Sequence, residues 1–194
     1  MPMKKFIALA ALAAASLAQA QTATGGATYA IDPTHTFVTY EITHFGTSTN
    51  RGRFDKKEGS VKFDKAAKTG RVEVSFDLAS VNTGVAAMNT HLLSDDLFSA
   101  AKFPTAKFVG DKFVFNGDKV VEVVGELTLK GKTAPVTLKA THFNCYDNPM
   151  LKREVCGGDF EAVIDRTQWG VDYGLAYGFP KNVKLVIQVE AVKQ

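Results

Sequence analysis

The residues best suited to chemistry in this sequence are its four histidines and two cysteines. No two of the histidines, His35, His44, His91 and His142, have the i, i+2 or i+4 spacing that commonly places two ligands on one metal ion. The sequence also lacks the Gly-x-Ser-x-Gly motif of serine hydrolases and the glycine-rich loop that holds nucleotide phosphates. We therefore expect no catalytic residues, no metal and no covalently bound cofactor.

The first 20 residues have the three parts of a secretory signal peptide. Lys4 and Lys5 make the start positive, residues 6–17 form an apolar run, and Ala18-Gln19-Ala20 is a small-x-small cleavage site. The run is shorter than the roughly 20 residues that a membrane-spanning helix needs. We predict a signal peptide over residues 1–20 and a periplasmic mature protein.

The mature sequence indicates one nearly neutral domain. Residues 21–27 are small and polar and predict a flexible N-terminus, and residues 28–194 have the length of one domain. Lys and Arg number 23 and Asp and Glu 20, and loss of Lys4 and Lys5 leaves 21 against 20. Without a basic cluster, we expect no nucleic-acid partner.

Cys145 and Cys156 lie close together in a chain that is predicted to enter an oxidising compartment. A disulfide is the default interpretation there, and it would close a short loop that contains Asn148 and Pro149. The alternative is a redox-active pair, but the Cys-x-x-Cys motif at a helix start is missing.

Alternation of apolar and polar residues predicts antiparallel strands along most of the chain. In a strand, successive side chains point to opposite faces, so residues two apart share a face. Turn-forming stretches, including 66–70, 116–118 and 130–132, separate the runs and fit hairpin connections. The clearest apolar sets are Val72, Val74, Phe76 and Leu78; Val121, Val123, Leu127 and Leu129; Val136, Leu138 and Ala140; and Leu185, Ile187 and Val189.

One stretch has helical periodicity. Between Gly84 and Phe98, apolar residues recur at steps of three and four, and Ser94 is placed to cap a second short turn. One helix cannot cover a large sheet, so the apolar face must pack on a second sheet or curl into a barrel. The long strands predicted at 36–45 and 119–130 favour an up-and-down barrel over a sandwich, and such a barrel can hold one elongated ligand.

Short motifs in a fixed order along the mature chain resemble the YceI-like family of bacterial periplasmic proteins. They cover about 165 residues, which makes a chance match improbable. They are residues 29–36, His44-Phe45-Gly46, Gly52-Arg53-Phe54, 59–64, 76–84, His91-Leu92, Asp96-Leu97-Phe98, 103–108, 125–133 and 165–170.

The resemblance implies an all-β fold, a lipocalin-like antiparallel eight-stranded β-barrel with one short helical segment. It also implies no enzymatic activity and an interior that binds a long isoprenoid lipid, such as ubiquinone or a polyprenyl phosphate, or a fatty amide. The segment 144–160 is similar to a subgroup with this cysteine pair, some of whose members resemble ubiquinone-8 binders. Asn89 and Thr90 stand where the family often has an Arg-Asp pair, which favours a neutral head group.

The strand phases and the helix predict which side chains contact the ligand. His44 shares the apolar phase of Val38, so it is either a buried histidine bonded to a carbonyl or a head-group contact at the barrel mouth. Asp165-Arg166 favours a turn-fixing pair, and Trp169 a core or rim residue. The predicted ligand-binding residues are Val38, Tyr40, Ile42, His44, Val74, Phe76, Met88, His91, Leu92, Phe108, Phe160, Trp169 and Tyr173.

Three functions fit these patterns. The first is binding, transport or storage of a long isoprenoid lipid, with transient contact to a membrane or to membrane redox proteins, as a monomer or homodimer. The second is a stress-related interaction domain with a fully packed core and no ligand. The third is an electron-transfer accessory that holds a quinone for a membrane enzyme.

Overall fold

The computed structural model describes residues 25–194, so the predicted signal peptide lies outside the described part of the chain. Within residues 25–194, no helix has the length and apolar composition needed to cross a bilayer. The strands are β1 (Ala27–Ile31), β2 (Phe37–His44), β3 (Ser48–Phe54), β4 (Lys57–Asp64), β5 (Thr69–Asp77), β6 (Val81–Asn82), β7 (Thr105–Asn116), β8 (Lys119–Leu129), β9 (Lys132–Asn148), β10 (Arg153–Asp165) and β11 (Asn182–Lys193). The helices are α1 (Ala86–Leu93) and the short 3-10 helices η1 (Leu78–Ser80), η2 (Arg166–Trp169) and η3 (Leu175–Tyr177).

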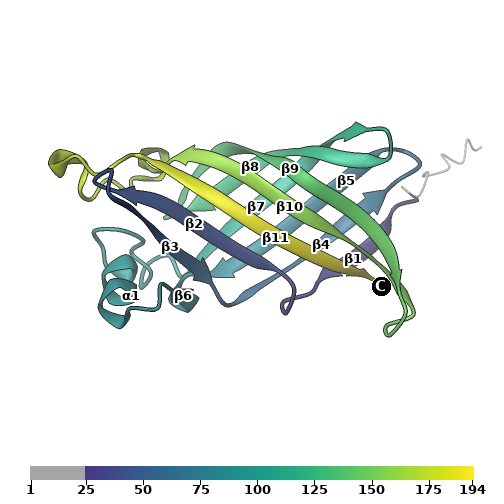
Figure 1. Cartoon of the computed structure of the whole chain (residues 1–194), viewed down its shortest axis with the longest axis horizontal. Helices are drawn as coiled ribbons and strands as arrows, with labels where there is room; N and C mark the ends of the chain where they lie inside the picture. The colour runs from purple at the N-terminus through teal and green to yellow at the C-terminus, as the bar shows by residue number, and fades with distance from the viewer. Residues whose placement is uncertain (1–24) are drawn as a thin grey trace, which may run out of the picture.

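Backbone pairing closes eight strands into an antiparallel barrel (Figure 1). The neighbours around the ring are β1, β4, β5, β7, β8, β9, β10 and β11, and β11 pairs back with β1. The predicted eight-stranded barrel is therefore confirmed. Neighbouring strands approach closely at some glycines. A Cβ on Gly125 of β8 would lie 2.2 Å from the carbonyl oxygen of Val109 on β7.

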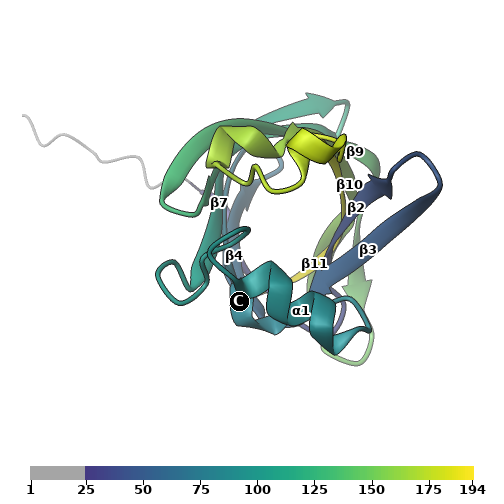
Figure 2. The ribbon, with the colours of Figure 1, turned by 90° about the vertical axis from the view of Figure 1, so that its left-hand side faces the viewer.

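A hairpin of β2 and β3 extends the wall beyond this ring. Residues 191–193 of β11 pair with β1, whereas residues 184–188 pair with β2. The strands β1 and β2 therefore pair with successive stretches of the same edge of β11. The two residues of β6 pair with β3 and lead directly into α1. Figure 2 looks at one end of the barrel, where α1 lies across the opening from the segment that joins β10 to β11.

The connections gather at the two ends of the barrel. The mouth end, as we call it, carries the β2–β3 turn, α1 and the 166–181 segment between β10 and β11 (Figure 2). The far end carries the C-terminus and the turn between β9 and β10 (Figure 1). Turns form where the sequence predicts them; Lys130 and Gly131, for example, both have positive φ and join β8 to β9.

Irregular pairing between β7 and β8 changes which side chains face inward. Asp111 and Val121 each lack a partner in the ladder, and the register shifts by one residue at each. Val120 and Val123 are therefore both buried although they are three positions apart. The prediction that Val121 shares the inward face of Val123 is wrong. The extra residue of the bulge reverses the alternation, and the sequence does not reveal it because residues 120, 121, 123 and 124 are all valine.

Helix α1 is shorter than the predicted 84–98. Gly84 has a φ of +79° before it, and at its end the amide and hydroxyl of Ser94 both donate to the carbonyl of His91. The chain then folds back, with the amide of Ser99 donating to the carbonyl of Ser94. One helix was the correct prediction, but these local hydrogen bonds end it after Leu93.

Candidate functional site

The inward face of the barrel surrounds a cavity of about 860 Å³. This volume falls within the roughly 300–1,000 Å³ typical of small-molecule sites. Valine, leucine, isoleucine and phenylalanine side chains make up most of its wall. The packed-core interpretation requires an interior filled by the protein's own side chains. This cavity contradicts it.

The cavity is elongated along the barrel. On β11 it is lined by alternate residues from Val183 to Ala191, a stretch of strand about 27 Å long. With a strand tilt of about 40°, this stretch covers about 20 Å of the barrel axis. The shape suits a chain-like molecule better than a compact one.

The structure brings all thirteen predicted ligand-binding residues to this cavity. They come from separate parts of the chain, and their contact with a ligand stays a prediction. The residues on its wall are Val38, Tyr40, Ile42 and His44 of β2, Val74 and Phe76 of β5, Met88, His91 and Leu92 of α1, Phe108 of β7, Phe160 of β10, and Trp169 and Tyr173 of the 166–181 segment.

Tyr40 places a hydroxyl in this apolar wall. Its ring lies over Gly52, where a Cβ would come within 2.5 Å of the Tyr40 oxygen. Burial raises the pKa of Tyr40 to about 12, so the hydroxyl stays neutral. It has no hydrogen-bond partner among residues 25–194, and it can donate to an oxygen atom of a bound molecule.

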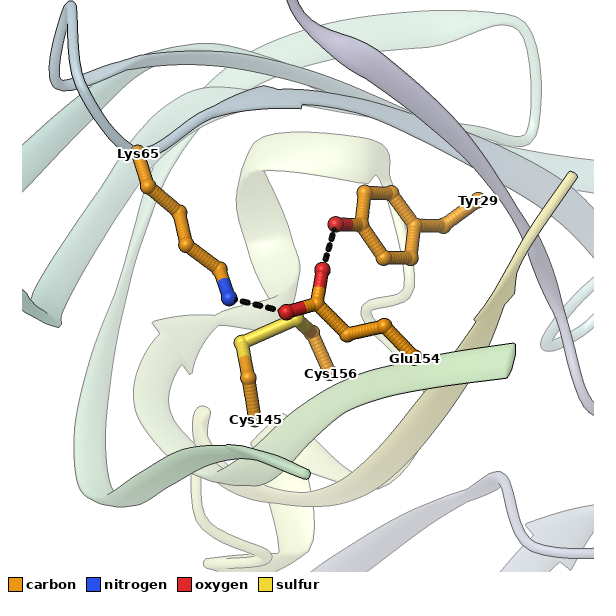
Figure 3. Close-up of a disulfide and its surroundings, with 5 residues drawn as sticks. All are labelled: Tyr29, Lys65, Cys145, Glu154 and Cys156. Atoms are coloured by element: carbon orange, nitrogen blue, oxygen red, sulfur yellow. Dashed lines mark hydrogen bonds and ion pairs between the residues drawn. A yellow bond between two sulfur atoms is a disulfide. The ribbon is translucent and has the colours of Figure 1, made fainter. Parts of the chain in front are cut away.

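At the far end of the cavity, the buried Tyr29 belongs to a polar cluster with Glu154 and Lys65 beside a disulfide (Figure 3). The hydroxyl of Tyr29 and the ammonium of Lys65 both donate to the Glu154 carboxylate. Burial, and then the bond to Glu154, raises the pKa of Tyr29. Burial also raises the pKa of Glu154, but hydrogen bonds from Lys65 and Tyr29 outweigh it and the net shift is downward.

The predicted disulfide between Cys145 and Cys156 is confirmed. The two residues are direct partners on β9 and β10, with Cα atoms 4.1 Å apart, and Cys156 reaches the cavity wall. With Glu154 they form the one group of three metal-type ligands in the described residues. Both sulfur atoms are used by the disulfide, so this group offers no thiolate to a metal.

Aromatic contacts connect the segments at the mouth end. The His44 and Phe45 rings lie 5.8 and 5.6 Å from the Phe179 ring, and the His91 ring lies 4.6 Å from that of Tyr173. His44 is exposed, so the prediction of a buried histidine is wrong. It is the last residue of β2, where the wall ends, and this position leaves the head-group interpretation standing.

Arg166 and Asp165 each hold the 166–181 segment between β10 and β11 in place, but they do not pair with each other. Buried Arg166 donates from Nε to the carbonyl of Pro180 at 2.9 Å and from Nη1 to that of Val171 at 2.6 Å. Its Nη2 has no partner in the described part of the chain. Asp165 accepts from Thr167 and lies 2.9 Å from Lys181.

Trp169 is a core residue that also borders the cavity. It is fully buried, and its indole N–H donates to the carbonyl of Leu127.

A family model described as a YceI-like domain matches residues 29–191. The chain belongs to the YceI family. A UPF0312 protein of Shewanella denitrificans is 36% identical over 199 residues, which cover 99% of this chain and 100% of the relative. Membership of the YceI family and the hollow barrel identify a binding protein rather than an enzyme.

Two solved structures share the YceI barrel. BcnA of Burkholderia cenocepacia superposes with a TM-score of 0.68 at 25% identity, over 83% of this chain and 99% of that chain. A polyisoprenoid binding domain of Saccharophagus degradans, implicated in plant cell wall breakdown, gives a TM-score of 0.61 at 16% identity, over 86% and 98%. At 16% identity, the second likeness shows that the two chains share a fold.

Several wall residues are absent from the thirteen predicted positions. The alternation on β11 already pointed to Leu185, Ile187 and Val189, which line the cavity. Phenylalanines are the other omission, and their abundance, 14 in the sequence, was the available signal. Those on the wall are Phe45, Phe54, Phe63, Phe98, Phe113, Phe143 and Phe179.

Proposed function

We propose that this protein binds a long isoprenoid lipid, with the apolar chain inside the barrel, and carries or stores it in the periplasm. The observation that carries the proposal is the elongated apolar cavity of about 860 Å³. The polyisoprenoid-binding neighbour of the same fold supports the ligand class. The signal-like residues 1–20 support the location.

Cavity length favours a long chain over an ordinary fatty acyl chain. The wall covers about 20 Å of axis on β11 alone, whereas one leaflet of a bilayer hydrocarbon core is about 15 Å thick. Each buried methylene contributes about 0.8 kcal/mol, so a longer chain uses more of the available wall. A prenyl tail of several units gains most from this tube.

The charges near the cavity favour a neutral head group such as that of ubiquinone. Two arginines border the cavity, and a phosphate would need a free cation. Arg51 already pairs with Glu41 at 2.7 Å. Arg166 uses Nε and Nη1 on backbone carbonyls, so only its Nη2 is left for a ligand, which is one donor for the several acceptor oxygens of a phosphate. The Tyr40 hydroxyl is a neutral donor suited to a quinone carbonyl.

The first test is mass spectrometry of organic extracts of the mature protein, purified from periplasm without detergent. We expect a prenyl quinone in molar proportion to protein. Extraction of a polyprenyl phosphate instead would keep the lipid class and overturn the neutral head group. A protein that is empty and takes up no added ubiquinone would overturn the proposal and favour the interaction domain.

A pair of variants tests whether the lipid occupies the barrel. Leu185→Trp places an indole on the cavity wall, and we expect it to abolish most ubiquinone uptake. Val186→Trp is the matched control, since the next residue on β11 points to the other face and is absent from the cavity wall. Equal uptake by the two variants would contradict binding inside the barrel.

A further inference from the structure

We propose that the mouth end of the barrel docks on the surface of a phospholipid bilayer. The proposal rests on the proposed function, because docking there would let a lipid pass between bilayer and cavity without crossing water. Three segments form the docking surface, which we call the rim: residues 44–50, 83–94 and 170–180. The His44 and Phe45 contacts with Phe179 and the His91 contact with Tyr173 hold these segments together.

The rim exposes large apolar side chains to solvent. Phe45 is 55% exposed, Val85 57% and Tyr177 77%, one from each segment. Soluble proteins seldom expose large apolar side chains in a contiguous group unless the surface binds something. All three side chains border the opening of the cavity, so the rim continues the apolar wall outward.

Helix α1 contributes no residue to the buried core that would explain its apolar composition. None of its residues is buried, and the consecutive residues Val85, Ala86, Ala87 and Met88 are all exposed. A run of four exposed apolar residues is unfavourable in water and marks a binding surface when it persists. The hydrophobic effect therefore predicts that this turn of helix is covered in use.

Charge is nearly absent from the rim. Its three segments contain one Asp, Glu, Lys or Arg, namely Asp172, although such residues make up 22% of the chain. Charged side chains surround the rim: Arg51, Asp95 and Lys181 flank its segments, and Lys130 donates to the carbonyl of Gly170. A surface without charge can enter the boundary between head groups and hydrocarbon at little desolvation cost, whereas burying a charge there is expensive.

The far end has the opposite character. Its hairpin turns carry Lys65 and Lys68, Asp118 and Lys119, and Lys152. Met150 and Leu151 are exposed in the last of these turns, at 91% and 43%, but Asp147, Lys152 and Arg153 flank them. The two ends of one barrel therefore differ in the kind of surface they can contact.

A bilayer fits the rim better than a second copy of the chain. Tyr173 and Tyr177 have apolar rings with polar tips, and such side chains favour the interface of a membrane with water. A bilayer also contains the proposed ligand, and the opening faces it directly. A dimer formed through the rim would close one cavity against another and leave no source of lipid.

The test is flotation of the mature protein with neutral vesicles of phosphatidylcholine and phosphatidylethanolamine. Ala87→Glu and Ala176→Glu each place a charge on the rim at an exposed residue that is not on the cavity wall, and we expect each to weaken vesicle binding by about tenfold or more. Met150→Glu is the matched control at the far end, where the side chain is 91% exposed, and it should bind vesicles like the wild type.

A second readout separates docking from ligand binding. We expect the rim variants to take up ubiquinone from vesicles more slowly, while they still bind a short-chain quinone added in water. Wild-type protein that does not float, or rim variants that float equally well, would overturn docking. So would a dimer in sedimentation analysis that dissociates in Ala176→Glu.

Failure of the proposed function has a different signature. Vesicle binding that depends on the rim, with no quinone taken up from vesicles or from water, would support the docking surface and overturn the lipid-carrier function.

Discussion

Individual side chains at the mouth end hold a long loop in place. Arg166 is 5% exposed, and it connects the start and the end of that loop by donating to the carbonyls of Val171 and Pro180. Burial lowers the pKa of its guanidinium, but an arginine stays charged at neutral pH. The loop conformation therefore depends on one charged group with two backbone acceptors.

Replacing Arg166 should destabilise the protein more than an exposed arginine does. We expect Arg166→Met to lower the free energy of unfolding by about 3 kcal/mol, because two buried carbonyls lose their charged donor. Exposed Arg153→Met should change it by less than about 0.5 kcal/mol. Urea denaturation measures both variants, and equal effects would show that the loop does not need Arg166.

Asp165 makes the stability depend on pH. Hydrogen bonds from Thr167 and Lys181 lower its pKa from 3.8 to about 2 in the folded protein. The unfolded chain therefore takes up the proton first as pH falls, so stability from this group is present above about pH 4 and is lost towards pH 2.

We expect the difference in unfolding free energy between wild type and Asp165→Asn to shrink as the pH is lowered from about 5 to about 2. Denaturation curves at several pH values provide the measurement. A difference that is constant over this range would show that the carboxylate charge is not what holds the loop.

Among the elements, β9 and β10 form the longest hairpin, and the disulfide joins them near the far end. The bridge between Cys145 and Cys156 restricts the hairpin turn in the unfolded chain as well as in the barrel. Its place on the cavity wall beside Tyr29 and Glu154 also makes it part of the closure of the far end (Figure 3).

Removing this disulfide should cost stability without changing the fold. By the loop-entropy model we expect Cys145→Ser with Cys156→Ser to lose about 2–3 kcal/mol of unfolding free energy. The measurement is urea denaturation combined with circular dichroism of the native state. Loss of the β-sheet spectrum would contradict this, because the hairpin ladder continues on both sides of the bridge.

At the scale of the whole molecule, ring closure creates an interior that no single element has. Eight strands place their apolar faces around one axis, and β11 pairs with β1 to complete the wall. Side chains that line a hollow interior of this size lack the dispersion contacts that they would make in a packed core. A ligand that fills the space restores those contacts and stabilises the folded state.

Bound ubiquinone should therefore raise the unfolding temperature. At a free concentration about 100 times the dissociation constant, we expect about 2.7 kcal/mol of added stability. Thermal unfolding followed by circular dichroism, with and without ubiquinone, measures the shift. Leu185→Trp should unfold at the same temperature under both conditions, and a shift in that variant would place the ligand elsewhere.

The sequence by itself determined the local features of this protein. Alternation identified the inward faces of β5 and β11, turn residues located the hairpins, and the cysteine spacing indicated the disulfide. These predictions are correct because side-chain direction in a strand and turn geometry depend on neighbouring residues alone. The ordered motifs along the chain likewise indicated the YceI family, because each of them is a short run of consecutive residues.

Only the tertiary structure decided the features that depend on distant parts of the chain. The bulge at Val121, the exposed place of His44 and the hollow interior follow from how strands pair and how side-chain volumes add around a ring. The rim unites three segments that are separated by tens of residues, so no local pattern displays it. Its apolar residues resemble core residues in the sequence, and they become a surface because ring closure leaves them at the open end.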